Sequence, residues 1–238
     1  MVNQTTVCAL LYGDYPELAL RCLGPLAELV HGGRIELRIG ANAISARTEE
    51  IISHLALGPS VFSRAPENIK KYPMMRRLLA FGTEKAISMP YAMWFDDDSY
   101  VKDLDRKAWL KRVEKSMETA DMIGSRYRIP LTDSQCRWIR SQAWYTGKEV
   151  LPGPRTPAWF LTGGWWTIRT EVLRRFDWPI PELLHRGGDV MLGQLLHQQG
   201  LRMSQFNSGV AINADEKGKE SAAKRRGFDS PPIGDDFC

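Results

Sequence analysis

The strongest constraint on the fold is an alternation of strand-like and helix-like segments along the first hundred residues. Strand patterns occur at Val7–Leu11, Arg34–Gly40, Val61–Ser63 and Tyr91–Phe95. Three helical patterns lie between these strands. The first begins at Pro16, the second follows the N-cap candidate Ser45, and the third runs from Pro73 to Ala86. Strands that alternate with helices predict a parallel α/β sheet.

The second half of the chain has a different character. A helix is expected around Arg106–Thr119, followed by a segment from Ser125 to Pro157 that is rich in arginine and tryptophan. We predict that this segment is a long loop, and loops of that length inside a compact domain are usually functional. A strand at Trp159–Ile168, interrupted by two glycines, and a helix at Asp189–Gln199, ended by Gly200, complete the pattern.

Composition adds few restrictions. The chain has 238 residues, a formal net charge of +4 and four cysteines without metal-ligand spacing, which we interpret as reduced thiols. No leader pattern and no apolar stretch near the roughly 20 residues that cross a bilayer is present, so a soluble, cytoplasmic protein is expected. The mild basic bias suits partners that carry phosphate.

The most specific motif is the run Trp94-Phe95-Asp96-Asp97-Asp98-Ser99-Tyr100. Three acidic residues directly after an apolar strand place carboxylates at the strand's carboxyl end, where open α/β sheets bind ligands. Carboxylate oxygens are the preferred ligands of hard divalent cations, which would also relieve the repulsion within the cluster. The alternative is a solvated acidic turn.

This run resembles the DxD region of GT-A glycosyltransferases of the family-two and Fringe-like type. The resemblance implies an α/β fold of the GT-A (Rossmann-like) type, a mixed, mostly parallel sheet flanked by helices in a single domain. It also implies Mn²⁺ or Mg²⁺ bound against the diphosphate of a nucleotide sugar such as a UDP-sugar. By this resemblance Asp98 is the direct metal ligand, Asp96 faces the ribose or the metal, and Asp97 assists.

Other segments fall where the resemblance requires donor-binding residues. The loop after the first strand, with Tyr12, Gly13 and Asp14, is similar to the loop that holds the nucleoside base, and Asn42 after the second strand is expected to contact the base. The segment Lys71-Tyr72-Pro73-Met74-Met75-Arg76-Arg77 resembles a helix start that offers a basic residue to the donor, which we assign to Arg76 and Arg77. A solvated helix face is the alternative for these arginines.

Two further segments are similar to parts of the sugar and acceptor site. Gly163 and Gly164 resemble the Gly-Gly segment beneath the transferred sugar, and Trp165 or Trp166 could offer a flat face to it, unless these tryptophans belong to the core. Asp189, at the start of a helix, matches the catalytic base of inverting enzymes, although Gly188 stands where an acidic residue is common. The alternative is that Asp189 only caps the helix.

The end of the chain supplies the last candidates. Related enzymes often have a histidine there as a metal ligand; this chain has none after His197, so Asn213 or Asp215 takes that place in the prediction. The basic segment 215–238 is expected to be a flexible tail. By the resemblance, residues 1–104 form the nucleotide-sugar and metal half and residues 105–214 the acceptor half, with the insertion 125–157.

The predicted activity is a metal-dependent, inverting hexosyl transfer from a UDP-sugar to an acceptor hydroxyl. One predicted acceptor is a hydroxymethylated pyrimidine in DNA, as in phage-type DNA glycosyltransferases, with the insertion's arginines and its residues Trp138, Trp144 and Tyr145 meeting the nucleic acid. A cell-envelope polysaccharide or lipid-linked glycan is the other. A non-catalytic nucleotide- or nucleic-acid-binding module and a nucleotidyltransferase are the rival functions.

Overall fold

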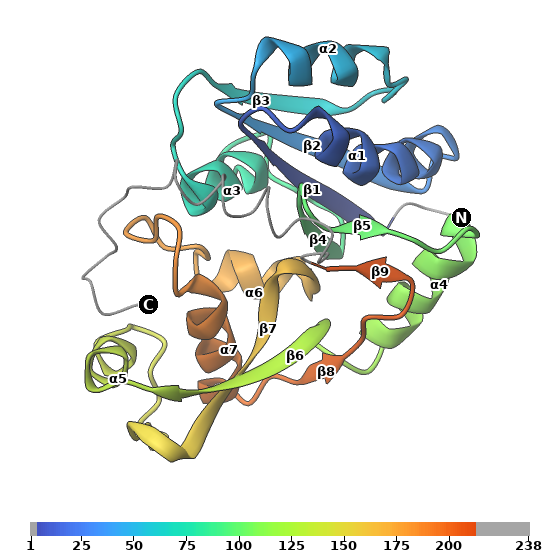
Figure 1. The fold of residues 1–238 in the computed structure, drawn as a ribbon. Helices are drawn as coiled ribbons and strands as arrows, with labels where there is room; N and C mark the ends of the chain where they lie inside the picture. The colour runs from blue at the N-terminus through green and yellow to red at the C-terminus, as the bar shows by residue number, and fades with distance from the viewer. Residues whose placement is uncertain (1–3, 213–238) are drawn as a thin grey trace.

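The computed structural model describes residues 4–212, and its centre is a seven-stranded sheet with the order β3-β2-β1-β4-β7-β6-β8 (Figure 1). β1 pairs in parallel with β2 and β4, β2 pairs in parallel with β3, and β7 runs antiparallel between β4 and β6. The sheet is therefore mixed and mostly parallel, as predicted. Its strands are β1 (Thr5–Tyr12), β2 (Ile35–Asn42), β3 (Val61–Ala65), β4 (Tyr91–Asp96), β6 (Met122–Leu131), β7 (Gly153–Arg169) and β8 (Met203–Gln205).

Two short strands lie outside this sheet. β5 (Tyr100–Val101) follows the triple-Asp motif and pairs antiparallel with β9 (Val210–Ala211). The last described strand thus returns to the loop that carries the acidic residues, as Figure 1 makes visible.

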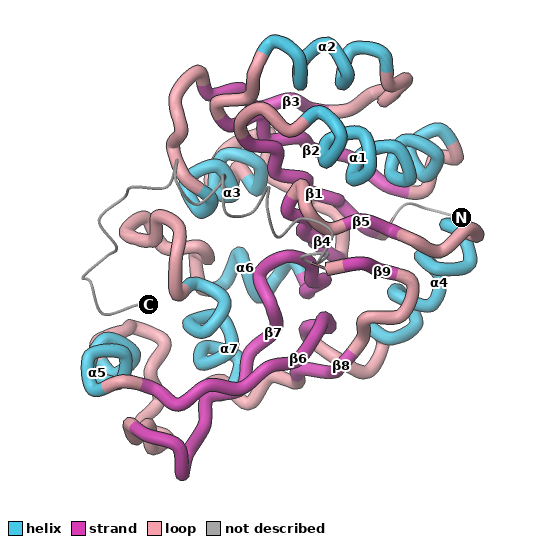
Figure 2. Tube along the Cα trace, viewed as in Figure 1, coloured by secondary structure: helices cyan, strands magenta, loops and turns pink. Residues whose placement is uncertain are grey.

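Helices cover both faces of the sheet (Figure 2). One face packs against α1 (Pro16–His31), α2 (Ala46–His54) and α4 (Arg106–Met117). The other packs against α3 (Lys71–Leu79), α5 (Asp133–Arg140), α6 (Thr170–Arg175) and α7 (Gly188–Gln198). None of the helices in the described part of the chain is long and apolar enough to cross a membrane.

Strand alternation creates two separate hydrophobic cores. In β1, Cys8 and Leu10 join the core beneath α3 and α7, whereas Val7, Ala9 and Leu11 join the core beneath α1. Trp94 and Trp166, on neighbouring strands, stack with ring centroids 6.2 Å apart in the first core. Because successive side chains of a strand point to opposite faces, the parallel strands read as continuous apolar runs in the sequence.

The predicted strands and helices of the first hundred residues are confirmed, with one shift. Ser45 caps α2, its hydroxyl accepting the Thr48 N–H at 3.1 Å. The helix expected from Pro73 to Ala86 instead runs from Lys71 to Leu79. It ends because Ala80 adopts a left-handed conformation with φ of 52°.

The prediction of a long loop over 125–157 was wrong. Most of this segment is the end of β6, helix α5 and the start of β7. The strand was missed because Arg126, Tyr127 and Arg128 are all exposed, so β6 lacks an alternating apolar pattern. The helix carries a signal that could have been found: Thr132 and Gln135 form a capping box.

The two glycines do not end β7, but they disturb its pairing. The register with β6 passes from Gly124↔Trp166 to Arg126↔Leu161, so a bulge of β7 residues lies between these pairs. Gly163 and Gly164 lie within it, which agrees with the predicted interruption.

Candidate functional site

The triple-Asp motif divides into two accessible carboxylates and one buried one. Asp96 and Asp98 are partly exposed, whereas the Asp97 side chain is turned inward, and the residue is only 3% exposed. Asp97 accepts the backbone N–H of Tyr12 at 3.3 Å. Asp97 therefore ties the loop after β1 to the end of β4, and it contacts the protein rather than being available to a donor.

A buried lysine holds Asp96. The Lys71 ammonium donates to Asp96 Oδ2 at 2.8 Å and to the backbone oxygen of Gly163 at 2.7 Å. The indole N–H of Trp94 donates to the other oxygen of Asp96 at 2.9 Å. Lys71 is 7% exposed, so its charge is neutralised inside the protein by this contact.

The same lysine stands beside the predicted base. A Cβ placed on Gly163 would lie 3.0 Å from Lys71 Nζ and 3.7 Å from Asp189 Oδ2. The absence of a side chain at Gly163 thus lets three segments that are distant in sequence meet: the end of β4, the start of α3 and the start of α7.

Asp189 has one anchored oxygen and one that faces Gly163. The N-cap of α7 is Gly187, with φ of 78°, so Asp189 is not the N-cap. Its Oδ1 accepts the Val190 N–H at 3.1 Å, a contact that helps to satisfy the helix start. Burial raises the pKa of the Asp189 carboxyl, and the nearby Lys71 charge opposes that rise only in part.

The glycine before Asp189 has a packing explanation. A Cβ on Gly188 would lie 2.1 Å from Cζ of Tyr72, so the tyrosine ring fills the space that a side chain would need. Burial, together with the charges of Asp189 and Asp96, raises the pKa of Tyr72 well above its usual value. Glycine rather than an acidic residue therefore precedes Asp189, because the buried, neutral Tyr72 ring occupies the space of a side chain at position 188.

The loop after β1 is held against the start of α2 by hydrogen bonds. Gly13 has φ of 67°, and its carbonyl accepts the Ser45 N–H at 3.1 Å. The Ser45 hydroxyl donates to Asp14 at 2.5 Å. Tyr12 is partly exposed and lies beside Asp97 through the backbone contact above. Base binding by Tyr12, Gly13 and Asp14 remains a prediction.

Asn42 and Arg76 are engaged elsewhere than predicted. Asn42 is 2% exposed; its amide accepts the Ile69 N–H at 2.9 Å and donates to Asn68 at 3.0 Å. It therefore fixes the loop before α3 rather than presenting its amide to a base. Arg76 donates to both the carboxylate and the carbonyl of Asp177, away from Asp96, because it lies on the opposite end of α3 from Lys71.

Arg77 is exposed on α3. The basic residue that α3 brings to Asp96 is Lys71, which the sequence prediction passed over in favour of these arginines. Its signal was its position at the start of the helix, the end that approaches the carboxyl edge of the sheet.

The aromatic residues proposed to stack on ligands are mostly core. Trp165 and Trp166 are 0% and 4% exposed, so neither offers a face to a sugar. Trp144 is 6% exposed, and Trp138 and Tyr145 pack against the same core. Trp144 is therefore a core residue, whereas stacking by the partly buried Trp138 and Tyr145 stays a prediction.

The carboxylates present suit a divalent cation supplied together with a diphosphate. Both oxygens of Asp96 accept hydrogen bonds, and Asp98, which is partly exposed, accepts the Ser99 hydroxyl at 3.4 Å. Mg²⁺ is commonly held by one or two carboxylates plus substrate phosphates and water. Within residues 4–212 no group of three or more His, Cys, Asp or Glu side chains converges on one point, and the candidates Asn213 and Asp215, like the tail 215–238, lie outside the described residues.

Comparisons with known proteins agree on the fold. The sequence matches no protein-family model and no curated protein. A mannosyltransferase from Pyrobaculum calidifontis, solved with GDP-Man and Mn²⁺, aligns with a TM-score of 0.62 and 15% identity over 95% of this chain and 61% of its own. Residues 1–349 of TarS from S. aureus align with a TM-score of 0.53 and 13% identity over 86% of this chain and 58% of theirs.

This chain spans less than two thirds of either protein, at 61% and 58% of their lengths. At 15% and 13% identity, the shared property is the fold. Strand order, helix placement and these alignments lead to one conclusion: the chain has the mixed α/β fold of GT-A glycosyltransferases.

Proposed function

We propose that this chain is a glycosyltransferase that moves a sugar from a nucleotide-sugar donor to an acceptor hydroxyl with the help of a divalent cation. The observation that carries the proposal is the meeting of Asp96, Lys71 and Asp189 around Gly163, from three separate elements. It occurs at the carboxyl end of β4, where open α/β sheets bind ligands. The mannosyltransferase with the same fold was solved with GDP-Man and Mn²⁺, which supports this class of donor.

In the proposed reaction, the acceptor oxygen attacks the anomeric carbon while the bond from that carbon to the diphosphate oxygen breaks. The free oxygen of Asp189 takes the proton of the acceptor hydroxyl, and the nucleoside diphosphate leaves. Asp98, with Asp96 beside it, would hold the cation, which supplies positive charge to the departing diphosphate. A single carboxylate base supports an inverting transfer.

Lys71 has a positioning part in this mechanism. Its ammonium holds Asp96 in place, and its charge keeps the Asp189 pKa from rising further. The bare backbone at Gly163 lets the Lys71 ammonium and the Asp189 carboxylate approach this strand closely.

For the acceptor we propose a saccharide. Of the aromatic residues predicted to stack on DNA bases, Trp144 is buried in the core, and Trp138 and Tyr145 are partly buried against it. Arg140, one of the arginines proposed to meet phosphates, instead donates to the carbonyl of Val150. A hydroxymethylpyrimidine in DNA is the alternative acceptor, and transfer to it should be assayed beside transfer to saccharides.

The test is calorimetry of donor binding, with UDP- and GDP-linked sugars, in the presence and absence of Mn²⁺. We expect wild-type binding to depend on the ion and the Asp98→Ala variant to lose that dependence while retaining its circular dichroism spectrum. Asp189→Asn should bind donor normally yet transfer about 10²–10⁴-fold more slowly, the usual contribution of a positioned base. Ion-independent donor binding by the wild type would contradict the proposal.

A further inference from the structure

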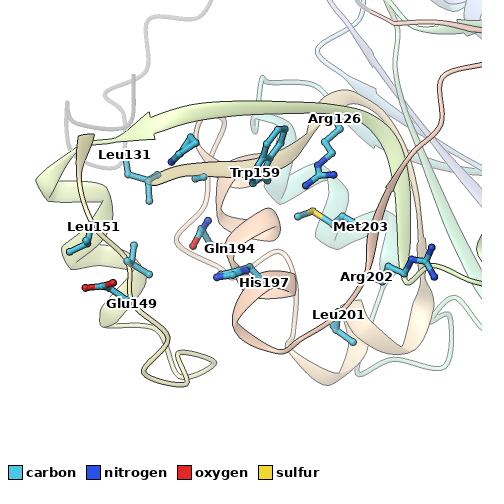
Figure 3. Close-up of a pocket in the computed structure, with 13 residues that line it drawn as sticks. Arg126, Leu131, Glu149, Leu151, Trp159, Gln194, His197, Leu201, Arg202 and Met203 are labelled. Atoms are coloured by element: carbon cyan, nitrogen blue, oxygen red, sulfur yellow. The ribbon is translucent and has the colours of Figure 1, made fainter. Parts of the chain in front are cut away.

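A cavity lies away from the triple-Asp motif, between the outer parts of β6 and β7 and the C-terminal half of α7 (Figure 3). Its volume is about 420 Å³, within the range of about 300–1,000 Å³ that is usual for ligand sites. The residues that characterise it are Arg126, Trp159, Gln194, His197, Arg202 and Met203. Arg126 belongs to the segment 125–157 whose arginines the sequence predicted to meet the acceptor.

Gln194 is the feature that most indicates a ligand. It is 5% exposed and lines the cavity from α7, on the same side as His197, three residues along the helix. Among the described residues its side-chain amide has no hydrogen-bond partner. The amide therefore faces the cavity, where both its oxygen and its N–H₂ group are open to a bound molecule.

The neighbouring Gln198 provides a contrast on the same helix. It is 1% exposed, yet its amide donates to the Lys148 carbonyl at 3.0 Å and accepts the Thr146 N–H at 3.1 Å. The protein therefore satisfies one buried glutamine of α7 with its own backbone and leaves the other directed at the cavity.

Aromatic and cationic groups form the rest of the wall. Trp159 is 39% exposed, and the Arg126 guanidinium carbon lies 4.1 Å from its ring centroid. A stacked guanidinium keeps its N–H edges free to bind an anion. Arg202 adds a second cation, while Glu149 on the rim places a negative charge beside them.

We infer that this cavity binds one unit of an anionic saccharide, a sugar that carries a phosphate or a carboxylate. The tryptophan offers an apolar edge to the ring, Gln194 and His197 offer hydrogen bonds to hydroxyls, and the two arginines bind the anion. Duplex DNA is disfavoured because it would require a continuous basic surface, whereas Glu149 places a negative charge in the lining of this cavity.

The cavity's place in the fold gives this binding a use. Asp189 and His197 lie on one helix, and eight residues of α-helix span about 12 Å. In the proposed transfer the cavity holds a non-reacting unit of the acceptor at about that distance from the base, a part of the inference that rests on the proposed function.

The experiment is NMR titration of the full chain, following the Trp159 indole and Gln194 amide signals. The probes are glucose 6-phosphate, glucuronate, glucose and inorganic phosphate. We expect at least one of the two charged sugars to shift both signals, glucose and phosphate to bind at least tenfold more weakly, and the preferred charged sugar to identify the anion. Gln194→Leu and Arg126→Ala should each weaken binding at least tenfold, whereas Arg137→Ala, an exposed arginine on α5, should not.

Folding is checked independently by the melting temperature, which Gln194→Leu should leave unchanged because its amide makes no hydrogen bond to the described residues. No shift with either charged sugar, equal binding of phosphate alone, or displacement of the sugar by short duplex DNA would overturn the inference. Asp98→Ala separates the two proposals: it should abolish transfer yet leave the cavity titration unchanged.

Discussion

At the scale of single residues, Lys71 is the most informative position in this chain. A buried lysine is costly unless its charge is matched, and here Asp96 matches it at 2.8 Å. The left-handed backbone of Lys70, with φ of 72°, directs the chain into α3 immediately before it. Such strain persists where surrounding contacts hold it, and here Asn42 and Asn68 do so.

We expect Lys71→Met to weaken metal-dependent donor binding by roughly ten- to a hundredfold. The variant removes a hydrogen bond to a charged group, a contact worth about 1.5–3 kcal/mol, and releases Asp96 from its position. Calorimetry measures the effect, with Arg77→Ala as the control on the same helix. If Arg77→Ala weakened binding as much as Lys71→Met, the arginine assignment from sequence would be restored.

The raised pKa of Asp189 predicts a pH dependence. A base must be ionised, so transfer should fall as pH decreases through this pKa, at a higher pH than an ordinary aspartate would give. Because the folded protein holds the proton more tightly than the unfolded chain, ionisation of Asp189 costs stability as pH rises through that pKa.

Asp189→Asn should therefore be more stable than the wild type at neutral pH, and the difference should shrink toward acid pH. Rate profiles and denaturant titrations at several pH values measure both effects. Equal stability of the two proteins at every pH would contradict the assigned shift.

The candidate site was partly predictable at this scale. Asp96, Asp98 and Asp189 could be selected because carboxylates next to a strand end or helix start form local patterns. Asn42 and Lys71 could not be assigned, because their contacts are made across the fold: a sequence shows an amide or a cation but not which loop or carboxylate it meets. Only the placement of α3 against β4 reveals that.

At the scale of elements, the close packing of α7 on β7 sets the geometry between Asp189 and Gly163. Gly193 permits this approach, since a Cβ there would lie 2.5 Å from the Trp159 carbonyl oxygen and 2.7 Å from Phe160 Cβ. The helix therefore cannot accept a side chain at this point without moving away from the strand.

Gly193→Ala should lower the free energy of unfolding by about 1–3 kcal/mol, the usual cost of overpacking. Gly24, within α1, is the matched control because a Cβ there would meet nothing within 4 Å. Gly24→Ala should raise the free energy of unfolding by about 0.5–1 kcal/mol through helix propensity. Denaturant midpoints measure both, and a loss of stability in Gly24→Ala that equals the loss in Gly193→Ala would contradict the packing argument.

The elements were predictable where the apolar pattern was strong. β1, β2 and β4 are buried on both faces and so appear as apolar runs or alternations. β6 extends beyond the layer of helices, with polar residues on both faces, and no periodicity marks it. Its existence depends on pairing with β7, a contact that local sequence does not encode.

At the scale of the whole molecule, the two cores contribute differently to the site. Lys71 and Asp189 come from α3 and α7, which share the core that contains Trp94 and Trp166. Neither Lys71 nor Asp189 comes from a helix that packs on the other core, which lies beneath α1, α2 and α4. The overall α/β architecture could be predicted from the alternation of strand and helix segments. Which core supports the site could not, because that depends on the register of the strands.

Leu78→Ala and Leu23→Ala test whether only the core beneath α3 and α7 affects the site. Both leucines are buried, at 1% and 0% exposure, and each variant should lose about 2–5 kcal/mol of unfolding free energy. Only Leu78→Ala, on α3, should also lower the rate constant of transfer, measured at a temperature where both variants are folded. A matching loss in Leu23→Ala would show that stability alone controls the rate.

The pairing of β5 with β9 has a consequence for the order of events during synthesis. Tyr100 pairs with Ala211, so the strand next to the triple-Asp motif gains its partner only after nearly all of the described chain has left the ribosome. The parallel strands β1 to β4 are available much earlier, and pairings between distant segments form late. We therefore expect a nascent chain to possess the paired strands β1 to β4 before the acidic loop is held in place, so that competence to bind a metal ion marks the end of folding.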